Sequence, residues 1–306
     1  MDCQDKPGNN DYKKAAQHRG RRVNFWIINT LNGLSLAMIL FLLAAGLTLI
    51  FGLMHIINMA HGSFYLLGGY IAISAIRLTG DFGTGALLAV IAIAITGVIV
   101  QRLFLARLYK QEMPQALLTL GLLFIVADFA FFTWGGDPLL VPEPRLLQGG
   151  VRFLGVVYPL YRLFLIGWGL ATALFLWAFL ERTKIGAIVR AGMDDEEMVR
   201  GLGINMPLVF TTIFALGAAL AAIGGVLGGP LLGMFPGADF EVALLAFVVV
   251  TVGGLGSIRG AFLGSLLVGL VDNFGNVWFP QLSLFTIFVP MVIVLALRPT
   301  GLMGRV

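Results

Sequence analysis

Apolar stretches long enough to cross a lipid bilayer recur along this chain, and they restrict its fold more than any other feature. About twenty helical residues, rising 1.5 Å each, span a hydrocarbon core of about 30 Å. Nine candidate segments are present, at 25–50, 56–76, 84–100, 116–134, 160–180, 208–227, 242–252, 261–278 and 284–297. Only 12% of residues are charged, against about 25% in soluble domains, which excludes a water-soluble fold. We therefore expect an all-α, polytopic transmembrane helix bundle with about eight or nine membrane segments.

The chain divides into a polar tail and one membrane domain. Residues 1–24 are polar and basic, and the apolar stretch that follows is too long and too rich in glycine for a cleaved signal peptide. We expect an uncleaved, disordered tail at 1–24 and a transmembrane domain over 25–306. The basic residues mark cytoplasmic loops, so they do not indicate a nucleic-acid partner.

The loops predict the orientation of the chain. Basic residues gather at 102–110, 182–200 and 298–305, which places these loops in the cytoplasm. Four predicted crossings lead from the second loop back to the third, as this placement requires. Five crossings precede the second loop and would put the basic tail outside, against the positive-inside tendency. Either the tail departs from the rule or one early element is broken or re-entrant, and we favour a broken element near 52–69.

One apolar segment, 56–72, contains polar and small residues. They are Asn58, His61, Gly62, Ser63, Gly68 and Gly69. Polar groups at membrane depth persist only where protein or a water-filled cavity supplies partners, and interrupted helices often line transport paths. This pattern predicts a translocation path. The alternative is that Asn58 and His61 cap two half-helices and form hydrogen bonds across the bundle. The two interpretations have equal weight, and both can hold at once.

A second segment, 248–270, is rich in glycine at Gly253, Gly254, Gly256 and Gly260. A nucleotide-binding loop is excluded because the chain contains no GxxxxGK[ST] motif. The pattern indicates a tight turn between closely packed helices.

The loop 182–206 is the most charged part of the chain outside the tail. It predicts one helix over about 185–201, with Ile185, Ile188, Val189, Met193 and Met198 on one side and the acidic residues on the other. Gly203 would help to end the helix. Such a helix suits docking to a soluble partner, and the alternative is a solvated connector.

Two acids, Asp128 and Asp272, lie inside apolar segments. Each is either a proton or cation site or a hydrogen-bonded packing residue. Cys3 is the only cysteine and the three histidines are scattered, so the sequence predicts no metal site.

These segments together resemble the permease subunits of the branched-chain amino acid family of ABC importers, specifically the smaller of the two permeases. The resemblance covers nearly all of 29–304 and is carried by 46–72, 186–205, 249–270 and the ending RPTGLMGR at 298–305. It departs from the family in two places: the run 242–252 is wholly apolar where a basic or more polar residue is common, and the charged tail is not a family feature.

The resemblance implies residue roles. Asn58, Ala60, His61 and Gly62 match the family's asparagine-x-alanine-histidine-glycine motif. The 182–206 loop would be the coupling helix that docks on an ATPase, and its predicted coupling residues are Arg190, Ala191, Asp194, Asp195, Glu196, Met198 and Gly203.

The resemblance also implies partners and location. They are a second homologous permease, two cytoplasmic ATPases, a periplasmic binding protein and the lipid bilayer of a bacterial inner membrane. ATP and Mg²⁺ would be bound by the ATPases, so this chain would bind no cofactor and would not be an enzyme.

Three alternatives stay open. The solute could instead be urea, an amide or another small molecule. An ion-coupled secondary transporter would use Asp128 or Asp272. A membrane enzyme is less favoured because no base and nucleophile lie close together in the sequence.

Overall fold

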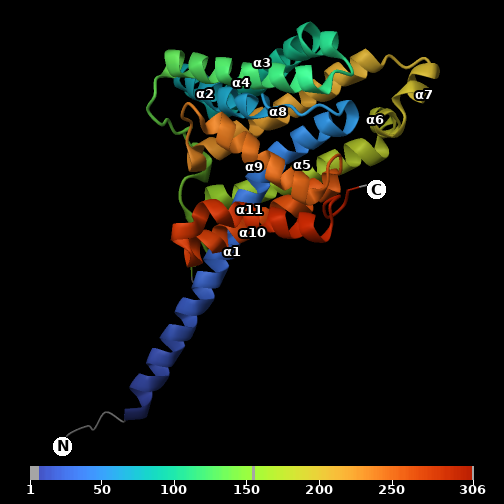
Figure 1. The fold of residues 1–306 in the computed structure, drawn as a ribbon. Helices are drawn as coiled ribbons and strands as arrows, with labels where there is room; N and C mark the ends of the chain where they lie inside the picture. Colours follow the sequence, from blue (N-terminus) through green and yellow to red (C-terminus); the bar gives the residue numbers. More distant parts are fainter. Residues whose placement is uncertain (1–6, 154–155, 305–306) are drawn as a thin grey trace, which may run out of the picture.

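A computed structural model describes residues 7–153 and 156–304, and this part of the chain is mostly helical (Figure 1). The α-helices are α1 (Pro7–Met54), α2 (His61–Thr79), α3 (Phe82–Leu103), α4 (Glu112–Trp134), α5 (Leu160–Arg182), α6 (Lys184–Asp194), α7 (Glu196–Gly201), α8 (Met206–Leu232), α9 (Ala238–Gly253), α10 (Ile258–Trp278) and α11 (Ser283–Leu297). The 3₁₀-helices are η1 (Leu105–Leu108), η2 (Arg145–Leu147) and η3 (Pro280–Leu282). The all-α prediction holds, apart from one antiparallel hairpin of β1 (Gly150–Phe153) and β2 (Val156–Pro159).

Within residues 7–153 and 156–304, six helices are long and apolar enough to cross a membrane. They are Asn24–Met54, Phe82–Leu108, Glu112–Trp134, Leu160–Arg182, Met206–Leu232 and Ile258–Trp278. The shorter helices α2, α9 and α11, with 19, 16 and 15 residues, account for the other predicted segments. The predicted stretches therefore correspond to helices, although fewer than nine of the described helices reach full membrane length by themselves.

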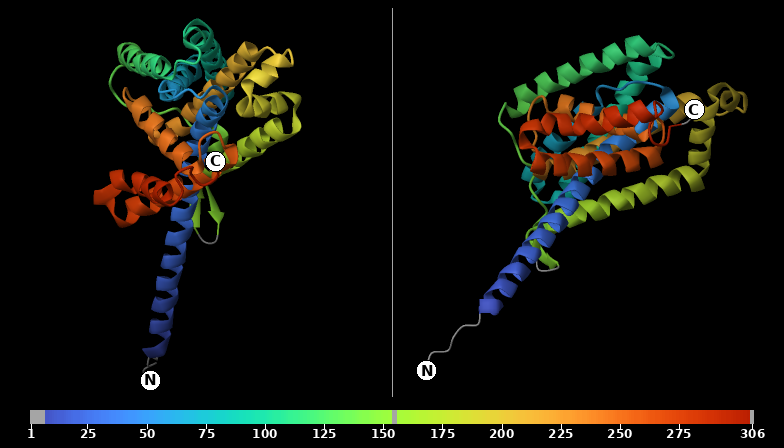
Figure 2. Two further views of the ribbon diagram at one scale, coloured as in Figure 1. Left: turned by 45° about the vertical axis from the view of Figure 1, so that its right-hand side comes forward. Right: turned by 60° about the horizontal axis from the view of Figure 1, so that its bottom comes forward.

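Helix α1 is the axis of the bundle. Its second half, from Ala37 to Ile50, is almost completely buried, and it packs against α5, α8, α9 and α10. The first half of α1 projects away from the other helices (Figures 1 and 2). The backbone of residues 7–23 continues this helix, which differs from the disordered tail expected there.

Glycines bring helix backbones into direct contact. A Cβ at Gly225 of α8 would lie 2.0 Å from the Tyr65 carbonyl oxygen of α2, and one at Gly68 would lie 2.6 Å from Ala222 Cα. Real side chains do not approach so closely, so only glycine allows these helices to pack at this distance. Such packing at small residues is typical of helix association in membranes.

The glycine segment 253–260 forms a tight turn between α9 and α10. Gly254 and Gly256 have φ angles of 103° and 77°, which favour glycine. Ser257 caps α10 by accepting a hydrogen bond from Gly260 N at 3.1 Å. The C-terminal segment completes the turn, because Leu302 N donates to Val252 O at 2.9 Å.

Candidate functional site

The helical path is interrupted between α1 and α2, over residues 55–60. This is narrower than the predicted 52–69, because Gly62, Ser63, Gly68 and Gly69 all lie in regular turns of α2. His55 begins the interruption with a φ of 53°, a conformation that non-glycine residues rarely adopt.

The first turn of α2 contacts the buried part of α1. His61 Nε2 lies 2.9 Å from Leu43 O, so this nitrogen is the donor. Leu43 precedes the end of α1 by about three turns, or about 16 Å along its axis. The first turn of α2 therefore lies deep beside α1, as a helix that begins inside the bundle would.

A polar interior surrounds this first turn. Asn58 and His61 are completely buried, and both amide atoms of Asn58 and Nδ1 of His61 have no hydrogen-bond partner among the described residues. Ser63 Oγ donates to Asp239 Oδ2 at 3.4 Å. A buried polar group without a partner is costly, so these atoms suit contact with water or a polar solute.

Asp239 is the residue that the sequence analysis missed. It is fully buried in the first turn of α9, and a Cβ at Gly62 would lie 1.9 Å from its carbonyl oxygen. The first turns of α2 and α9 therefore touch. The available signal was an acid two residues after a glycine, Gly237, between two apolar segments, since acids are favoured in the first turn of a helix.

Helix α4 holds the interrupted segment in place. Thr119 Oγ1 accepts a hydrogen bond from Met59 N at 3.2 Å and lies 3.3 Å from Ile57 O, to which its hydroxyl can donate. The same hydroxyl lies 3.0 Å from Ala116 O of its own helix, so its single proton is shared between Ala116 and Ile57, while its oxygen satisfies the Met59 N–H.

The two predicted intramembrane acids have different surroundings. Asp128 is exposed on α4. Asp272 is only 8% exposed, and it accepts hydrogen bonds from Thr286 and Asn276, both at 3.2 Å. Asp272 thus has the contacts of a packing residue that joins α10 to α11.

The charged loop forms two helices, so the single helix predicted over 185–201 is wrong. Asp195 interrupts it with φ −153°, and its carboxylate accepts a hydrogen bond from Met198 N at 2.9 Å, which caps α7. The predicted apolar side is also only partly correct. Val189 is buried, whereas Ile185 and Met198 are 47% and 56% exposed.

Ion pairs connect α6 to α5 and α5 to α10, and a further pair lies within α7. Glu181 at the end of α5 meets Arg190 of α6 at 3.7 Å and Arg259 of α10 at 2.9 Å. Glu196 pairs with Arg200 within α7 at 2.6 Å.

The remaining predicted coupling residues lie in the same region. Ala191 is partly buried and Asp194 is exposed at the end of α6. Gly203 turns the chain with a φ of 83°, and Asn205 then caps α8 by accepting from Leu208 N at 3.2 Å.

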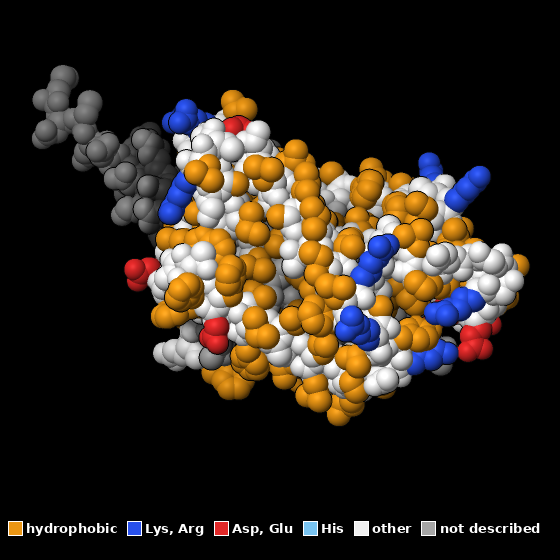
Figure 3. Space-filling model, turned by 90° about the horizontal axis from the view of Figure 1, so that it is seen from above, with side chains coloured by type: hydrophobic (Ala, Val, Ile, Leu, Met, Phe, Trp, Pro, Cys, Tyr) orange, Lys and Arg blue, Asp and Glu red, His pale blue; other side chains and the backbone are white. Residues whose placement is uncertain are grey.

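The surface agrees with a membrane protein that has one charged end. Apolar side chains cover the broad face above α3 and α4, while lysine and arginine side chains gather mainly towards the end where α7 lies (Figure 3). A basic end is expected on the cytoplasmic side.

Comparisons with known proteins agree with these features. Residues 29–297 match the family model described as the permease component of the branched-chain amino acid transport system. The chain is 31% identical to BraD, a high-affinity branched-chain amino acid transport permease of Pseudomonas aeruginosa, over 90% of this chain and 94% of the relative. It is 28% identical to the corresponding permease LivH of Escherichia coli, over 92% and 96%. Identity to the Escherichia coli ribose import permease RbsC is 28%, over 82% and 78%.

Proposed function

The chain belongs to the branched-chain amino acid transport system permease family, and from this premise we propose that it moves branched-chain amino acids across a bacterial inner membrane. It would act as one of two homologous permeases in an ABC importer. A periplasmic binding protein would deliver the amino acid, and two cytoplasmic ATPases would supply the energy. This chain would contribute no catalytic residue.

The observation that carries the proposal is the pair α6–α7. Met198 and Leu202 are 56% and 73% exposed beside a cluster of acids, next to α6, which is attached to α5 by the ion pair between Arg190 and Glu181. A rigid protrusion with exposed apolar side chains and charges suits docking into a cleft of a soluble partner. Closure of the ATPases on ATP would then shift the permease between outward-facing and inward-facing states.

The topology that fits this role has nine membrane elements, α1 to α5 and α8 to α11. Three of them, α2, α9 and α11, are shorter than a full crossing. The start of α2 beside Leu43 supports a helix that begins within the membrane. In this arrangement the C-terminus and α6–α7 face the cytoplasm, and the start of α1 faces outward.

The path for the solute would pass the first turns of α2 and α9. Buried polar atoms of Asn58, His61 and Asp239 that find no partner among the described residues support this position. Two helix N-termini also meet there, and their dipoles favour a carboxylate.

The test is reconstitution of the permease with its partners in vesicles. We expect ATP-dependent, binding-protein-dependent uptake of labelled leucine, isoleucine and valine, and no uptake of urea or ribose. Uptake of urea or ribose in place of the amino acids would reject the proposed solute. Uptake by this chain alone, driven by an ion gradient, would reject the ABC mechanism.

The docking role is tested with matched exposed methionines. Met198→Asp should release the ATPases and lower uptake about tenfold or more, because it places a charge in the centre of the interface. Met113→Asp changes an exposed methionine of α4 and should leave the ATPases bound. Equal effects of the two substitutions would remove α7 from the interface.

A further inference from the structure

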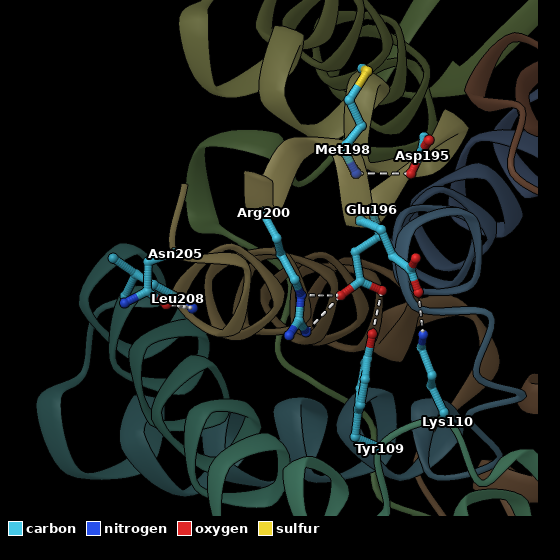
Figure 4. Close-up of polar contacts among 9 residues, drawn as sticks. Tyr109, Lys110, Asp195, Glu196, Met198, Arg200, Asn205 and Leu208 are labelled. Atoms are coloured by element: carbon cyan, nitrogen blue, oxygen red, sulfur yellow. Dashed lines mark hydrogen bonds and ion pairs between the residues drawn. The ribbon is translucent and has the colours of Figure 1, made fainter. Parts of the chain in front are cut away.

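Helix α7 contacts the connector between α3 and α4, which is far from it in the sequence. Tyr109 donates its hydroxyl to Glu196 Oε2 at 2.5 Å, and Lys110 Nζ lies 3.1 Å from Glu197 Oε1 (Figure 4). The residues of each pair are 87 positions apart in the chain. This contact joins the docking segment to a part of the bundle that it does not reach covalently.

The Tyr109–Glu196 contact is the stronger of the two. The Glu196 side chain is 20% exposed, and its other carboxylate oxygen accepts from Arg200. Lys110 and Glu197 are 62% and 83% exposed, and exposed ion pairs contribute little stability. A hydrogen bond to a carboxylate is short and strong, so Glu196 transmits displacement of α7 to Tyr109 better than Glu197 does.

Tyr109 is 37% exposed, and its ring has neighbours on α7 and α8. Its ring packs against Phe210 of α8 at 6.1 Å, and the Arg200 guanidinium lies 5.1 Å from the ring centre. The next residue, Lys110, has a φ of 61°, a costly conformation for a residue other than glycine. That backbone conformation accompanies the turn that directs both side chains towards α7.

The connection continues from α4 to the interrupted segment. Tyr109 and Lys110 lead directly into α4, where Thr119 accepts a hydrogen bond from Met59 N and lies 3.3 Å from Ile57 O. These two residues flank Asn58 and lead to His61, at the proposed path. Only 17% of the apolar window of α4 is buried, and at its far end Trp134 Nε1 donates to Ser74 Oγ of α2 at 2.8 Å.

The region between these contacts has room for movement. A cavity of about 570 Å³ lies beside α7, and its lining includes His55, Gln101, Tyr109 and Glu196. A displacement of α7 towards this cavity would carry the Tyr109–Glu196 contact into it.

We propose that Tyr109 and Thr119 are positioning residues that transmit the movement of α7 through α4 to residues 57–59. This inference rests on the proposed function of α6–α7 as the docking site for the ATPases. This route would act in addition to the direct connection of α6 and α7 to α5 and α8 along the chain. It would make the position of the first turn of α2 depend on the state of the ATPases.

The test combines two conservative variants with matched controls, measured as solute moved per ATP hydrolysed. We expect Tyr109→Phe and Thr119→Val each to lower this ratio at least about threefold. The double variant should lower it no further, since both residues lie on one route. The controls are Tyr158→Phe, whose hydroxyl binds Asn32, and Thr212→Val, whose hydroxyl binds only its own helix at Leu208.

A second measurement does not depend on the solute. In a Cys3→Ser background, Ile57→Cys places a thiol at a 43% exposed position of the interrupted segment. Its labelling rate by a water-soluble reagent should differ between nucleotide-free and ATP-bound complexes. Tyr109→Phe should abolish this difference, whereas Tyr158→Phe should preserve it.

The outcomes separate the two proposals. If the wild-type complex takes up urea in place of amino acids, the proposed solute is wrong and the labelling result still decides the route. If both variants keep wild-type ratios and the nucleotide-dependent labelling persists in Tyr109→Phe, the route is refuted although the transport function stands.

Discussion

Replacement of Gly62 by alanine should test the contact between the first turns of α2 and α9. The added Cβ would lie 1.9 Å from Asp239 O, where ordinary contacts begin at 3.4 Å, so the backbones would have to separate by about 1.5 Å. Both colliding groups are parts of buried helices and have little freedom to shift. Overpacking in a core typically costs about 1–3 kcal/mol, and we expect a loss of about 3 kcal/mol here.

Gly121 of α4 provides the matched control. A Cβ there would meet nothing within 4 Å, so Gly121→Ala should stabilise the helix by about 0.5–1 kcal/mol. Thermal unfolding in detergent, followed by tryptophan fluorescence, compares the variants. The apparent Tm of Gly62→Ala should fall by roughly 6–12 °C, from about 2–4 °C per kcal/mol. If Gly62→Ala and Gly121→Ala melt within about 2 °C of each other, the close approach of α2 and α9 is wrong.

Three further predictions concern single side chains. Burial, and after it the hydrogen bond to Glu196, raises the pKa of Tyr109 from 10.0 to about 12. The neutral phenol therefore contributes fully to the stability of the folded protein below pH 10, and this contribution is lost as the pH rises to 12. The phenolate absorbance of Tyr109 is the difference between the wild-type protein and the Tyr109→Phe variant, and it should appear near pH 12. In the Glu196→Gln variant this absorbance should appear at a lower pH. Asp195→Ala should cost α7 about 1 kcal/mol by removing its cap; hydrogen exchange of its amides should accelerate, and Asp195→Asn should largely prevent this. Asp272→Asn should keep uptake within about twofold because its role is packing; a collapse of uptake would instead indicate proton or ion transfer.

The helices were predictable because length and hydropathy are local properties. Each of the nine apolar segments coincides with a helix, and the polar residues at 58 and 61 marked the interruption. The boundary of that interruption was less predictable. Gly62, Gly68 and Gly69 suggest irregular backbone in sequence, yet all three are helical. They allow close packing instead: Gly62 against the backbone of α9, Gly68 against Ala222 of α8, and Gly69 against the Met234 side chain.

The site depends on contacts that no local pattern contains. Tyr109 and Glu196 are 87 positions apart, and each alone is an ordinary residue of a polar loop. The break at Asp195 reflects competition between continuing a helix and capping the next one, which periodicity does not resolve. Asp239 was missed because its significance comes from the glycine of α2 that faces it.

The glycine contacts between α2 and α8 also determine which parts of the molecule can move. Gly225 lies against the Tyr65 backbone and Gly68 against Ala222, so any sliding of one helix along the other would drive backbone atoms together. We expect α2 and α8 to behave as a single rigid body during the transport cycle, because closely packed interfaces shift between discrete arrangements and do not deform continuously. Spin labels on these two helices should keep a constant separation when ATP binds. The permease would then alternate between its outward-facing and inward-facing states by movement of the less tightly packed helices around the rigid pair α2 and α8.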